Sequence, residues 1–265
     1  MGKKRADLLL FEKGLVDSRE KGKRVIMEGT VFIGTRRIDK PGDYIDEDED
    51  IVVKTNPLIY VSRGGLKLEK AISTFGLNLE KVTAMDIGAS TGGFTDCMLR
   101  SGAVKVYAVD VGYNQLDWKL RNDQRVVVME RTNIRNVKKD DIGESIDFIS
   151  IDVSFISLRL VLPVASSLLS ENGEIVALVK PQFEAGREKV GKKGIVRDVN
   201  THYEVIKNIL EFSNSIGLIP KSLTYSPVTG ATGNIEFLIH LVNKGESFEE
   251  DLIKAVIKEA HDTLK

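Results

Sequence analysis

The sequence predicts an α/β protein, with a mostly parallel sheet covered by helices on both faces and a small α/β unit before it. Two observations carry this prediction. From about residue 60 onward, short apolar segments alternate with amphipathic ones, as in a parallel sheet with crossover helices. Residues 5–54 instead combine two helical patterns with short strands, and "NPLIY" follows as a linker. We therefore predict two domains, residues 1–57 and 58–265.

In the first domain, the segments "RADLLLFEKGL" and "SREKGKRVIMEG" have helical periodicity, and each ends near a glycine. Ser18 is the candidate N-cap of the second helix, because a serine hydroxyl can accept a backbone N–H of the first turn. The segments "TVFIG" and "DIVVK" are predicted strands.

In the second domain, five apolar segments are predicted strands: "VTAMDIG", "VKVYAVDVG", "RVVVME", "IDFISIDV" and "GEIVALVK". Two later strands, "KSLTYSPV" and "GNIEFLIHLVN", are joined by a loop with glycines and are predicted to pair antiparallel. The last helix is predicted to begin at a capping box of Ser247 and Glu250. Phe248, Leu252 and Val256 give that helix one apolar face.

Composition limits the class of protein. Hydrophobic residues make up 42% of the 265 residues, which suits a globular chain. A single cysteine, Cys97, excludes an internal disulfide. No apolar run approaches the ~18 residues of a membrane span, and the N-terminus lacks a signal-peptide pattern. We expect a cytoplasmic protein. Basic residues gather in residues 1–42 and 186–197, which suggests anionic partners.

The glycine-rich stretch "DIGASTGGFTDCMLRSG", residues 86–102, is the main functional signal. A phosphate-binding P-loop would need a lysine after the second glycine, and none follows. A dinucleotide fingerprint would need glycine at position 90, where Ser90 stands. What remains is an acid, Asp86, followed by a glycine loop that opens a helix. A second acid, Asp110, ends the next predicted strand.

Both acids are predicted at the carboxyl ends of adjacent strands, where ligands bind in doubly wound sheets. Asp110 can accept both hydroxyls of a ribose, and Asp86 favours a cationic ligand over pyrophosphate. S-adenosyl-L-methionine, with a ribose, an ammonium and a sulfonium, fits this pattern better than a nicotinamide cofactor. A purely structural strand–helix turn is the alternative. The predicted cofactor-binding residues are Asp86, Gly88, Ala89, Ser90, Gly92, Gly93, Phe94, Asp110, Val111, Asn133 and Asp152.

Transfer of a methyl group needs an aligned acceptor, and a hydroxyl acceptor must also lose a proton. The "DVSF" stretch lacks the pattern usual for exocyclic amine acceptors, and Cys97 is predicted to pack as a small apolar residue, so an oxygen acceptor is favoured. Lys180 ends an apolar strand and is the candidate base, because burial and a nearby cation lower a lysine pKa. Lys67 and Glu236 are candidates for the same rim.

Several motifs closely resemble those of the TlyA family, also called hemolysin A-like. They are "VSRGGLKL", "DIGASTGGFTDCML", "VDVGYNQLDWKLR", "ERTNIR", "DVSFISL", "VKPQFEAG" and "SPVTGATGNIEFL". The resemblance implies an FtsJ-like, Rossmann-like class I methyltransferase fold, a seven-stranded sheet with the last pair of strands reversed. It also implies 2′-O-methylation of cytidine in ribosomal RNA. The histidines of the sequence show no metal-ligand spacing, so no metal is expected.

The same resemblance implies a catalytic tetrad of Lys67, Asp152, Lys180 and Glu236. In this interpretation Lys180 is the base or orients the 2′-hydroxyl. Lys67 lowers the pKa of Lys180 and steers the ribose-phosphate, while the two carboxylates hold the lysines in place.

The N-terminal "GLVDSREKGKRVIMEGTVFIG" followed by "DKPGD" resembles an S4 RNA-binding domain. S4 domains often carry "VNG" where this chain has "FIGTRR", so the RNA contacts are less well defined than the fold. The predicted contacts with ribosomal RNA or ribosomal subunits are Arg5, Arg19, Lys23, Arg24, Lys40 and Arg63. Two alternative functions are a non-catalytic RNA-binding or ribosome-assembly protein and a membrane-active cytolysin.

Overall fold

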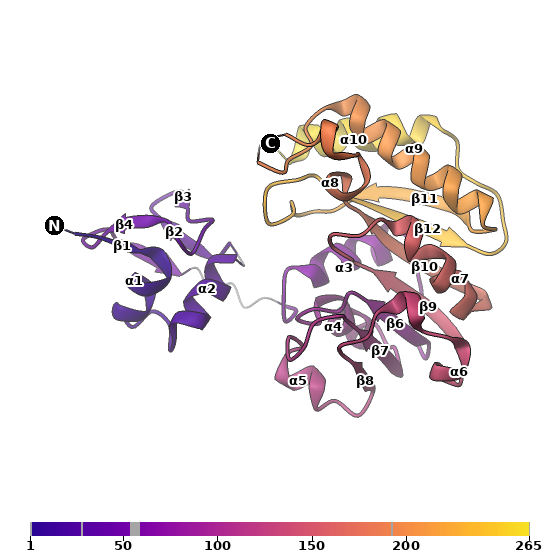
Figure 1. The fold of residues 1–265 in the computed structure, drawn as a ribbon, viewed down its shortest axis with the longest axis horizontal. Helices are drawn as coiled ribbons and strands as arrows, with labels where there is room; N and C mark the ends of the chain where they lie inside the picture. Colours follow the sequence, from indigo (N-terminus) through magenta and orange to yellow (C-terminus); the bar gives the residue numbers. More distant parts are fainter. Residues whose placement is uncertain (1, 28, 54–58, 192, 265) are drawn as a thin grey trace. The chain divides into compact units, whose positions relative to one another are not determined.

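The computed structural model describes residues 2–27, 29–53, 59–191 and 193–264. The chain divides into two compact units, Met1–Ile59 and Tyr60–Lys265 (Figure 1). The predicted domain boundary at residues 57 and 58 and most of the "NPLIY" linker lie outside the described residues.

The first unit packs two helices against short strands. Its helices are α1 (Ala6–Glu12) and α2 (Arg19–Met27), and its strands are β1 (Lys3–Arg5), β2 (Val31–Ile33), β3 (Arg36–Arg37), β4 (Tyr44–Asp46) and β5 (Ile51–Val53). In the described residues, β1 pairs with β4, and β2 lies between β3 and β5. The Ser18 hydroxyl accepts the Lys21 N–H at 3.1 Å, which confirms the predicted cap. The assignment of this unit to the S4 fold remains a prediction.

The second unit is built on a sheet that comprises seven strands in the described residues, in the order β11-β12-β10-β9-β6-β7-β8. The strands are β6 (Thr83–Ile87), β7 (Lys105–Val109), β8 (Val126–Met129), β9 (Ile146–Ile151), β10 (Leu169–Val179), β11 (Ile219–Tyr225) and β12 (Phe237–Val242). Among these strands β12 alone runs opposite to the others, because it pairs antiparallel with both β10 and β11. The expectation that the last pair is reversed is therefore wrong: β11 runs with the parallel strands.

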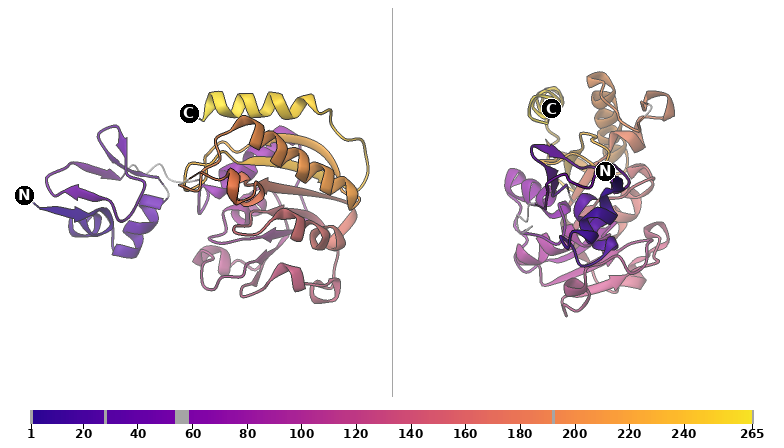
Figure 2. Two further views of the ribbon diagram at one scale, coloured as in Figure 1. Left: turned by 45° about the horizontal axis from the view of Figure 1, so that its top comes forward. Right: turned by 90° about the vertical axis from the view of Figure 1, so that its left-hand side faces the viewer.

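Helices cover both faces of this sheet (Figures 1 and 2). One face packs against α3 (Gly64–Phe75), α4 (Gly93–Arg100) and α5 (Trp118–Arg121). The other face packs against α6 (Lys139–Ile142), α7 (Leu162–Leu168), α9 (Val199–Ser215) and α10 (Asp251–Thr263). Successive strand residues point to opposite faces of the sheet. In β10, Ile175 and Ala177 pack on the face covered by α9 and α10, whereas Val176 packs on the face covered by α3 and α4. The predicted α/β class is confirmed.

The start of α10 differs from the prediction. The helix begins at Asp251, and Glu250 precedes it without a side-chain cap. The Glu250 carboxylate instead accepts hydrogen bonds from Tyr203 and Lys207 on α9. The predicted capping box is therefore wrong, because the Glu250 carboxylate binds side chains of α9 and does not cap α10. Within the described part of the chain, no helix combines the length and apolar character needed to cross a bilayer.

Candidate active site

One edge of the sheet gathers the predicted catalytic residues. The parallel strands end there, so Asp152 directly follows β9 and Lys180 directly follows β10. The reversed strand β12 begins at this same edge, which brings in Glu236 immediately before it. Lys67 comes from the first turns of α3. Three neighbouring strands and one helix thus supply four ionisable side chains to one place.

These four side chains form a continuous chain of contacts. Lys180 Nζ lies 2.5 Å from Asp152 Oδ1. Lys67 Nζ lies 4.0 Å from Asp152 Oδ2 and donates a hydrogen bond to Glu236 Oε2 at 2.6 Å. All are largely shielded from solvent, with side-chain exposures between 3% for Glu236 and 20% for Asp152. The structure therefore brings together the four residues of the predicted tetrad.

The electrostatics of the cluster favour charged side chains. Burial acts to lower the pKa of Lys67, but the carboxylates of Asp152 and Glu236 outweigh it, so the pKa of Lys67 is raised. Burial likewise acts to raise the pKa of Asp152, but the charges of Lys67 and Lys180 outweigh it, so the pKa of Asp152 is lowered. The positive charge of Arg63, the residue before α3, acts to lower the pKa of Lys67, which opposes the effect of the carboxylates.

Sequence reasoning missed the residues that hold this cluster in position. Lys180 Nζ donates a hydrogen bond to Ser154 Oγ at 2.9 Å. Glu184, at the end of the short helix α8 (Pro181–Glu184), accepts hydrogen bonds from Ser157 Oγ at 2.6 Å and Leu158 N at 2.8 Å. Glu184 thereby ties the segment after β10 to the segment after β9. Ser154 lies in the quoted motif "DVSFISL" and Glu184 lies in "VKPQFEAG". Only the fold shows that these two segments are in contact.

A second support lies beside Glu236. The buried Asn234 accepts the Val196 N–H at 2.9 Å and donates to the Gly194 carbonyl at 2.8 Å. Gly230 packs so closely that an added Cβ would lie 2.6 Å from Glu236 Oε1. Asn234 thus fastens the basic segment 186–197 to the loop that covers Glu236.

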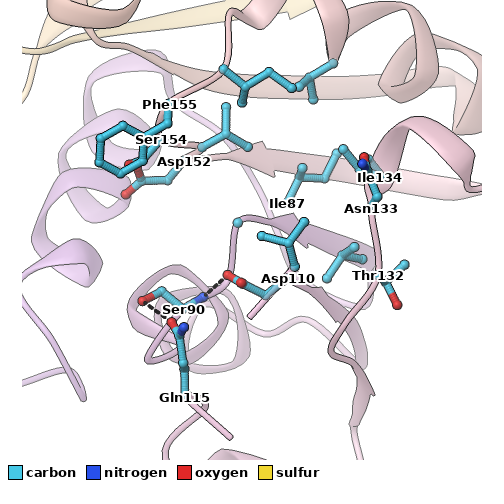
Figure 3. A pocket seen from close by; sticks show the side chains of 16 residues that line it. Ile87, Ser90, Asp110, Gln115, Thr132, Asn133, Ile134, Asp152, Ser154 and Phe155 are labelled. Carbon is cyan, nitrogen blue, oxygen red and sulfur yellow. Dashed lines mark hydrogen bonds between the residues drawn. The ribbon is translucent and has the colours of Figure 1, made fainter. Parts of the chain in front are cut away.

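A cavity of about 420 Å³ opens next to the tetrad (Figure 3). Asp152 belongs both to the tetrad and to the cavity wall. Six of the predicted cofactor-binding residues line it: Gly88, Ser90, Asp110, Val111, Asn133 and Asp152. Gln115, Thr132, Ser154 and Phe155 also line it and were not predicted, although all four stand inside quoted motifs.

Backbone donors fix the orientation of Asp110 in this cavity. Asp110 Oδ2 accepts the Ser90 N–H at 2.8 Å, and Oδ1 accepts the Gly112 N–H at 2.6 Å. Each carboxylate oxygen keeps further acceptor capacity for a ligand. Asn133 uses its amide oxygen to accept the Arg135 N–H at 3.1 Å, which leaves the amide nitrogen as a donor at the cavity wall.

The structure corrects the expected role of Asp86. This residue is not among the described residues that line the cavity; it is fully buried, and its carboxylate accepts hydrogen bonds from Thr95 Oγ1 at 2.7 Å and Ser150 Oγ at 3.2 Å. Burial raises the pKa of Asp86 to about 7. Met85 and Ile87 face the α9 core, so alternation along β6 turns Asp86 towards α4. Asp86 therefore binds Thr95 and Ser150 in the interior and does not face the cavity.

Four other residues of the glycine loop likewise lie outside the described lining: Ala89, Gly92, Gly93 and Phe94. Gly92 has a φ of +93°, and an added Cβ there would lie 2.3 Å from Leu120 Cδ1. A Cβ on Gly93 would lie 2.9 Å from Gly65 N at the start of α3. Gly93 therefore allows α3, which carries Lys67, to approach α4 closely, and Gly92 makes room for Leu120 of α5.

The predicted RNA contacts have different surroundings. Arg5 Nε and Arg19 Nε lie 3.0 Å and 3.1 Å from the fully buried Asp7, so both guanidinium groups help to neutralise a buried charge within the first unit. Lys23 Nζ lies 3.9 Å from Glu20. Arg24 and Lys40 are exposed, and Arg63 stands beside the tetrad at the start of α3. The RNA-binding role of all six residues remains a prediction.

Comparison with known proteins agrees with this architecture. The family model for FtsJ-like methyltransferases matches residues 60–243. The Bacillus subtilis protein named "Putative rRNA methyltransferase YqxC" is 57% identical over 269 residues, covering 99% of this chain and 96% of the relative. The Mycobacterium tuberculosis protein named "16S/23S rRNA (cytidine-2'-O)-methyltransferase TlyA" is 39% identical, covering 89% of each chain.

A solved structure extends the similarity to the whole chain. The "Putative hemolysin from Streptococcus thermophilus" is 49% identical, with a TM-score of 0.79 over 99% of this chain and 97% of that one. The chain therefore belongs to the FtsJ-like methyltransferase family and, within it, to the group of relatives that includes TlyA.

Proposed function

We propose that this protein transfers the methyl group of S-adenosyl-L-methionine to the ribose 2′-hydroxyl of a cytidine in ribosomal RNA. The observation that carries the proposal is the position of Asp152, which contacts both lysines of the tetrad and also lines the cavity. A methyl donor bound in the cavity and a hydroxyl acceptor bound at the tetrad would thus both lie next to Asp152. The printed names of YqxC and TlyA support ribosomal RNA as the substrate, and that of TlyA supports cytidine.

The residues present fit S-adenosyl-L-methionine. The volume of about 420 Å³ is within the usual range of ligand sites, ~300–1,000 Å³. Asp110 offers oriented acceptors for the ribose hydroxyls, and the Asn133 amide nitrogen offers a donor for the adenine ring. Val111, Ile134 and other apolar side chains supply walls for the base. When bound, the cofactor supplies a methyl group on a positively charged sulfur, which is ready for displacement.

The tetrad can handle the proton of the acceptor. Lys180 Nζ is the candidate to take the 2′-hydroxyl proton or to orient that hydroxyl. Lys67, whose pKa is raised, stays the cation of the cluster and keeps Asp152 partnered when Lys180 turns to substrate.

Positive charge near the site suits an RNA substrate. The basic segment 186–197 follows α8 directly, and Arg63 stands at the start of α3. Arginine and lysine contacts to phosphates position RNA without specifying its sequence. We propose that these residues, together with the first unit acting as an S4 domain, bind ribosomal RNA within ribosomal subunits. The reaction would then take place in the cytoplasm, where subunits are assembled.

The test is mass-spectrometric mapping of methyl groups after incubation with deuterated S-adenosyl-L-methionine. Protein-free 16S and 23S RNA and both ribosomal subunits serve as substrates in parallel. Digestion to nucleosides should yield labelled 2′-O-methylcytidine. Label on a base atom would refute the proposal, and so would cofactor binding without transfer to any of the four substrates. The latter result would favour a non-catalytic RNA-binding protein.

A further inference from the structure

Gln115 belongs to the wall of the cofactor cavity, the cavity of about 420 Å³ beside the tetrad. Figure 3 shows the side chains of Gln115, Ser90 and Asp110 together on one side of it. Gln115 Oε1 accepts a hydrogen bond from Ser90 Oγ at 3.4 Å. This contact engages the amide oxygen, so the amide nitrogen is the part of Gln115 that can donate to a ligand.

The Gln115 amide nitrogen lies close to the carboxylate of Asp110. An added Cβ on Gly112 would lie 2.3 Å from Gln115 Nε2 and 3.0 Å from Asp110 Oδ1, so these two atoms border the same small space. A hydroxyl group can both donate and accept a hydrogen bond. A ribose hydroxyl at this place could therefore donate to Asp110 and accept from Gln115.

Glu130, which directly follows β8, fixes the backbone of Gln115. Glu130 Oε1 accepts the Gln115 N–H at 3.0 Å and a hydrogen bond from Arg121 Nη2 at 2.7 Å. Burial acts to raise the pKa of Glu130, but these donors and the N–H groups of Asn114 and Leu116 outweigh it and lower that pKa from 4.5 to about 2. Glu130 is thus ionised at neutral pH and anchors the turn that carries Gln115.

The backbone of this turn is held on a second side. Arg131 N donates to the Gly112 carbonyl at 2.9 Å, which joins the segment after β8 to the segment after β7. Asn114 and Arg131 have φ values of +57° and +53°, in the left-handed region. Residues other than glycine keep such conformations where the surrounding contacts fix them. The fold therefore sets the position of Gln115 before a ligand binds.

We propose that Gln115 is a further cofactor-binding residue, whose Nε2 donates a hydrogen bond to the same ribose hydroxyl that donates to Asp110, and that Glu130 is its positioning residue. The inference rests on the proposed function for the identity of the cofactor. A hydroxyl that is bound by a donor and an acceptor at once cannot be replaced by hydrogen without leaving both partners unpaired. The site should therefore discriminate against cofactor analogues that lack this hydroxyl.

The test measures binding of S-adenosyl-L-homocysteine and of its 2′-deoxy and 3′-deoxy analogues by isothermal titration calorimetry, without RNA. The unsubstituted protein should bind at least one deoxy analogue about tenfold more weakly than the parent compound, because a hydrogen bond to a charged group and one to an amide are lost. Gln115→Leu should bind the parent compound about fivefold more weakly. It should bind that deoxy analogue as tightly as the unsubstituted protein does, since the Gln115 hydrogen bond is absent in both cases.

Glu130→Gln tests the positioning role, because it keeps the shape of the side chain and removes its charge. It should weaken binding of S-adenosyl-L-homocysteine by less than Gln115→Leu does. The double variant Glu130→Gln with Gln115→Leu should bind like Gln115→Leu alone, since Glu130 acts through Gln115. Full additivity of the two losses would overturn the positioning role of Glu130.

Gln124→Leu is the matched control, because Gln124 is exposed in a turn before β8 and should leave binding of all three ligands unchanged. An equal loss of affinity for the parent compound and both analogues in Gln115→Leu would overturn Gln115 as a ligand of the ribose. Absence of S-adenosyl-L-homocysteine binding by the unsubstituted protein would instead overturn the cofactor site of the proposed function.

Discussion

Lys67 Nζ donates a hydrogen bond to Glu236 Oε2 at 2.6 Å, although the two residues are 169 positions apart in the chain. Glu236 is 2% exposed, so this is a buried ion pair that joins α3 to the start of β12. Removing either partner would leave an uncompensated charge in the interior.

Glu236→Leu is accordingly expected to lower the free energy of unfolding by about 3 kcal/mol. The double variant Lys67→Met with Glu236→Leu should lose clearly less than the sum of the two single variants, because it buries no unpaired charge. Urea unfolding of all four proteins gives the coupling free energy of the pair. Strict additivity would show that the two side chains do not stabilise each other.

Lys180→Ala should reduce methyl transfer by about 10²- to 10⁴-fold, the usual contribution of a positioned acid–base group. Affinity for S-adenosyl-L-methionine should hold, because Lys180 is not among the described residues lining the cofactor cavity. Single-turnover rates and calorimetric titration measure the two effects separately. Lys258→Ala, an exposed change on α10, is the control for loss of a lysine. Full activity in Lys180→Ala would remove Lys180 from the mechanism.

Asp110→Ala should weaken binding of S-adenosyl-L-methionine about 10- to 100-fold, as expected for a lost hydrogen bond to a charged group. The change also frees the N–H groups of Ser90 and Gly112 that the carboxylate now accepts. Asp110→Asn keeps one acceptor and should bind with intermediate affinity. Isothermal titration calorimetry measures all three proteins, with the exposed Asp140→Ala on α6 as the control. Equal affinities would exclude Asp110 from the cofactor site.

Asp86 should give stability an unusual dependence on pH. Its pKa is raised from 3.8 to about 7 by burial, so the folded state favours the protonated acid. Its contribution is fully present below about pH 4 and is lost as pH rises through 7, a change on the order of 4 kcal/mol. Asp86→Asn lacks this loss, so its stability relative to the unsubstituted protein should increase between pH 4 and pH 8. A pH-independent difference in urea unfolding would argue that Asp86 stays ionised when folded.

Gly88 allows the glycine loop to pass over the backbone of Asp152. Its φ is +88°, and an added Cβ would lie 2.5 Å from the Asp152 carbonyl oxygen. Gly88→Ala should therefore displace Asp152 and impair both stability and methyl transfer. Gly217 has a similar φ of +82° with no atom within 4 Å of an added Cβ, so Gly217→Ala reports the backbone strain alone, ~1–2 kcal/mol. Equal destabilisation in thermal unfolding would contradict the predicted collision.

The sequence indicated the large sheet well, because its buried strands are apolar runs bounded by glycines and charged residues. It did not indicate β1, β3 and β4, whose sequences KKR, RR and YID are largely charged or polar, whereas the equally short β2 and β5 are apolar and were indicated. The capping box failed for a different reason: Tyr203 on α9 engages Glu250, and such contacts between helices leave no local pattern.

The site was predicted in part for similar reasons. Asp152 and Lys180 were found because each ends an apolar strand, a position that the chain itself marks. Glu184 was missed because its role depends on two loops meeting, which only the fold determines. Asp86 was predicted to face the ligand because the sequence shows where the strand ends. The sequence does not show as clearly to which face of the sheet the last side chains of that strand point.

The reversed strand β12 has a consequence for the order in which the protein matures during translation. The described residues that line the cofactor cavity lie between Ile87 and Val161, so they leave the ribosome well before Glu236. The partner of Lys67 arrives only when the last strand inserts between β10 and β11. A nascent chain that stops after β11 would therefore hold the residues of the proposed donor site with an incomplete tetrad, and the four side chains come together only once nearly all of the chain has been synthesised.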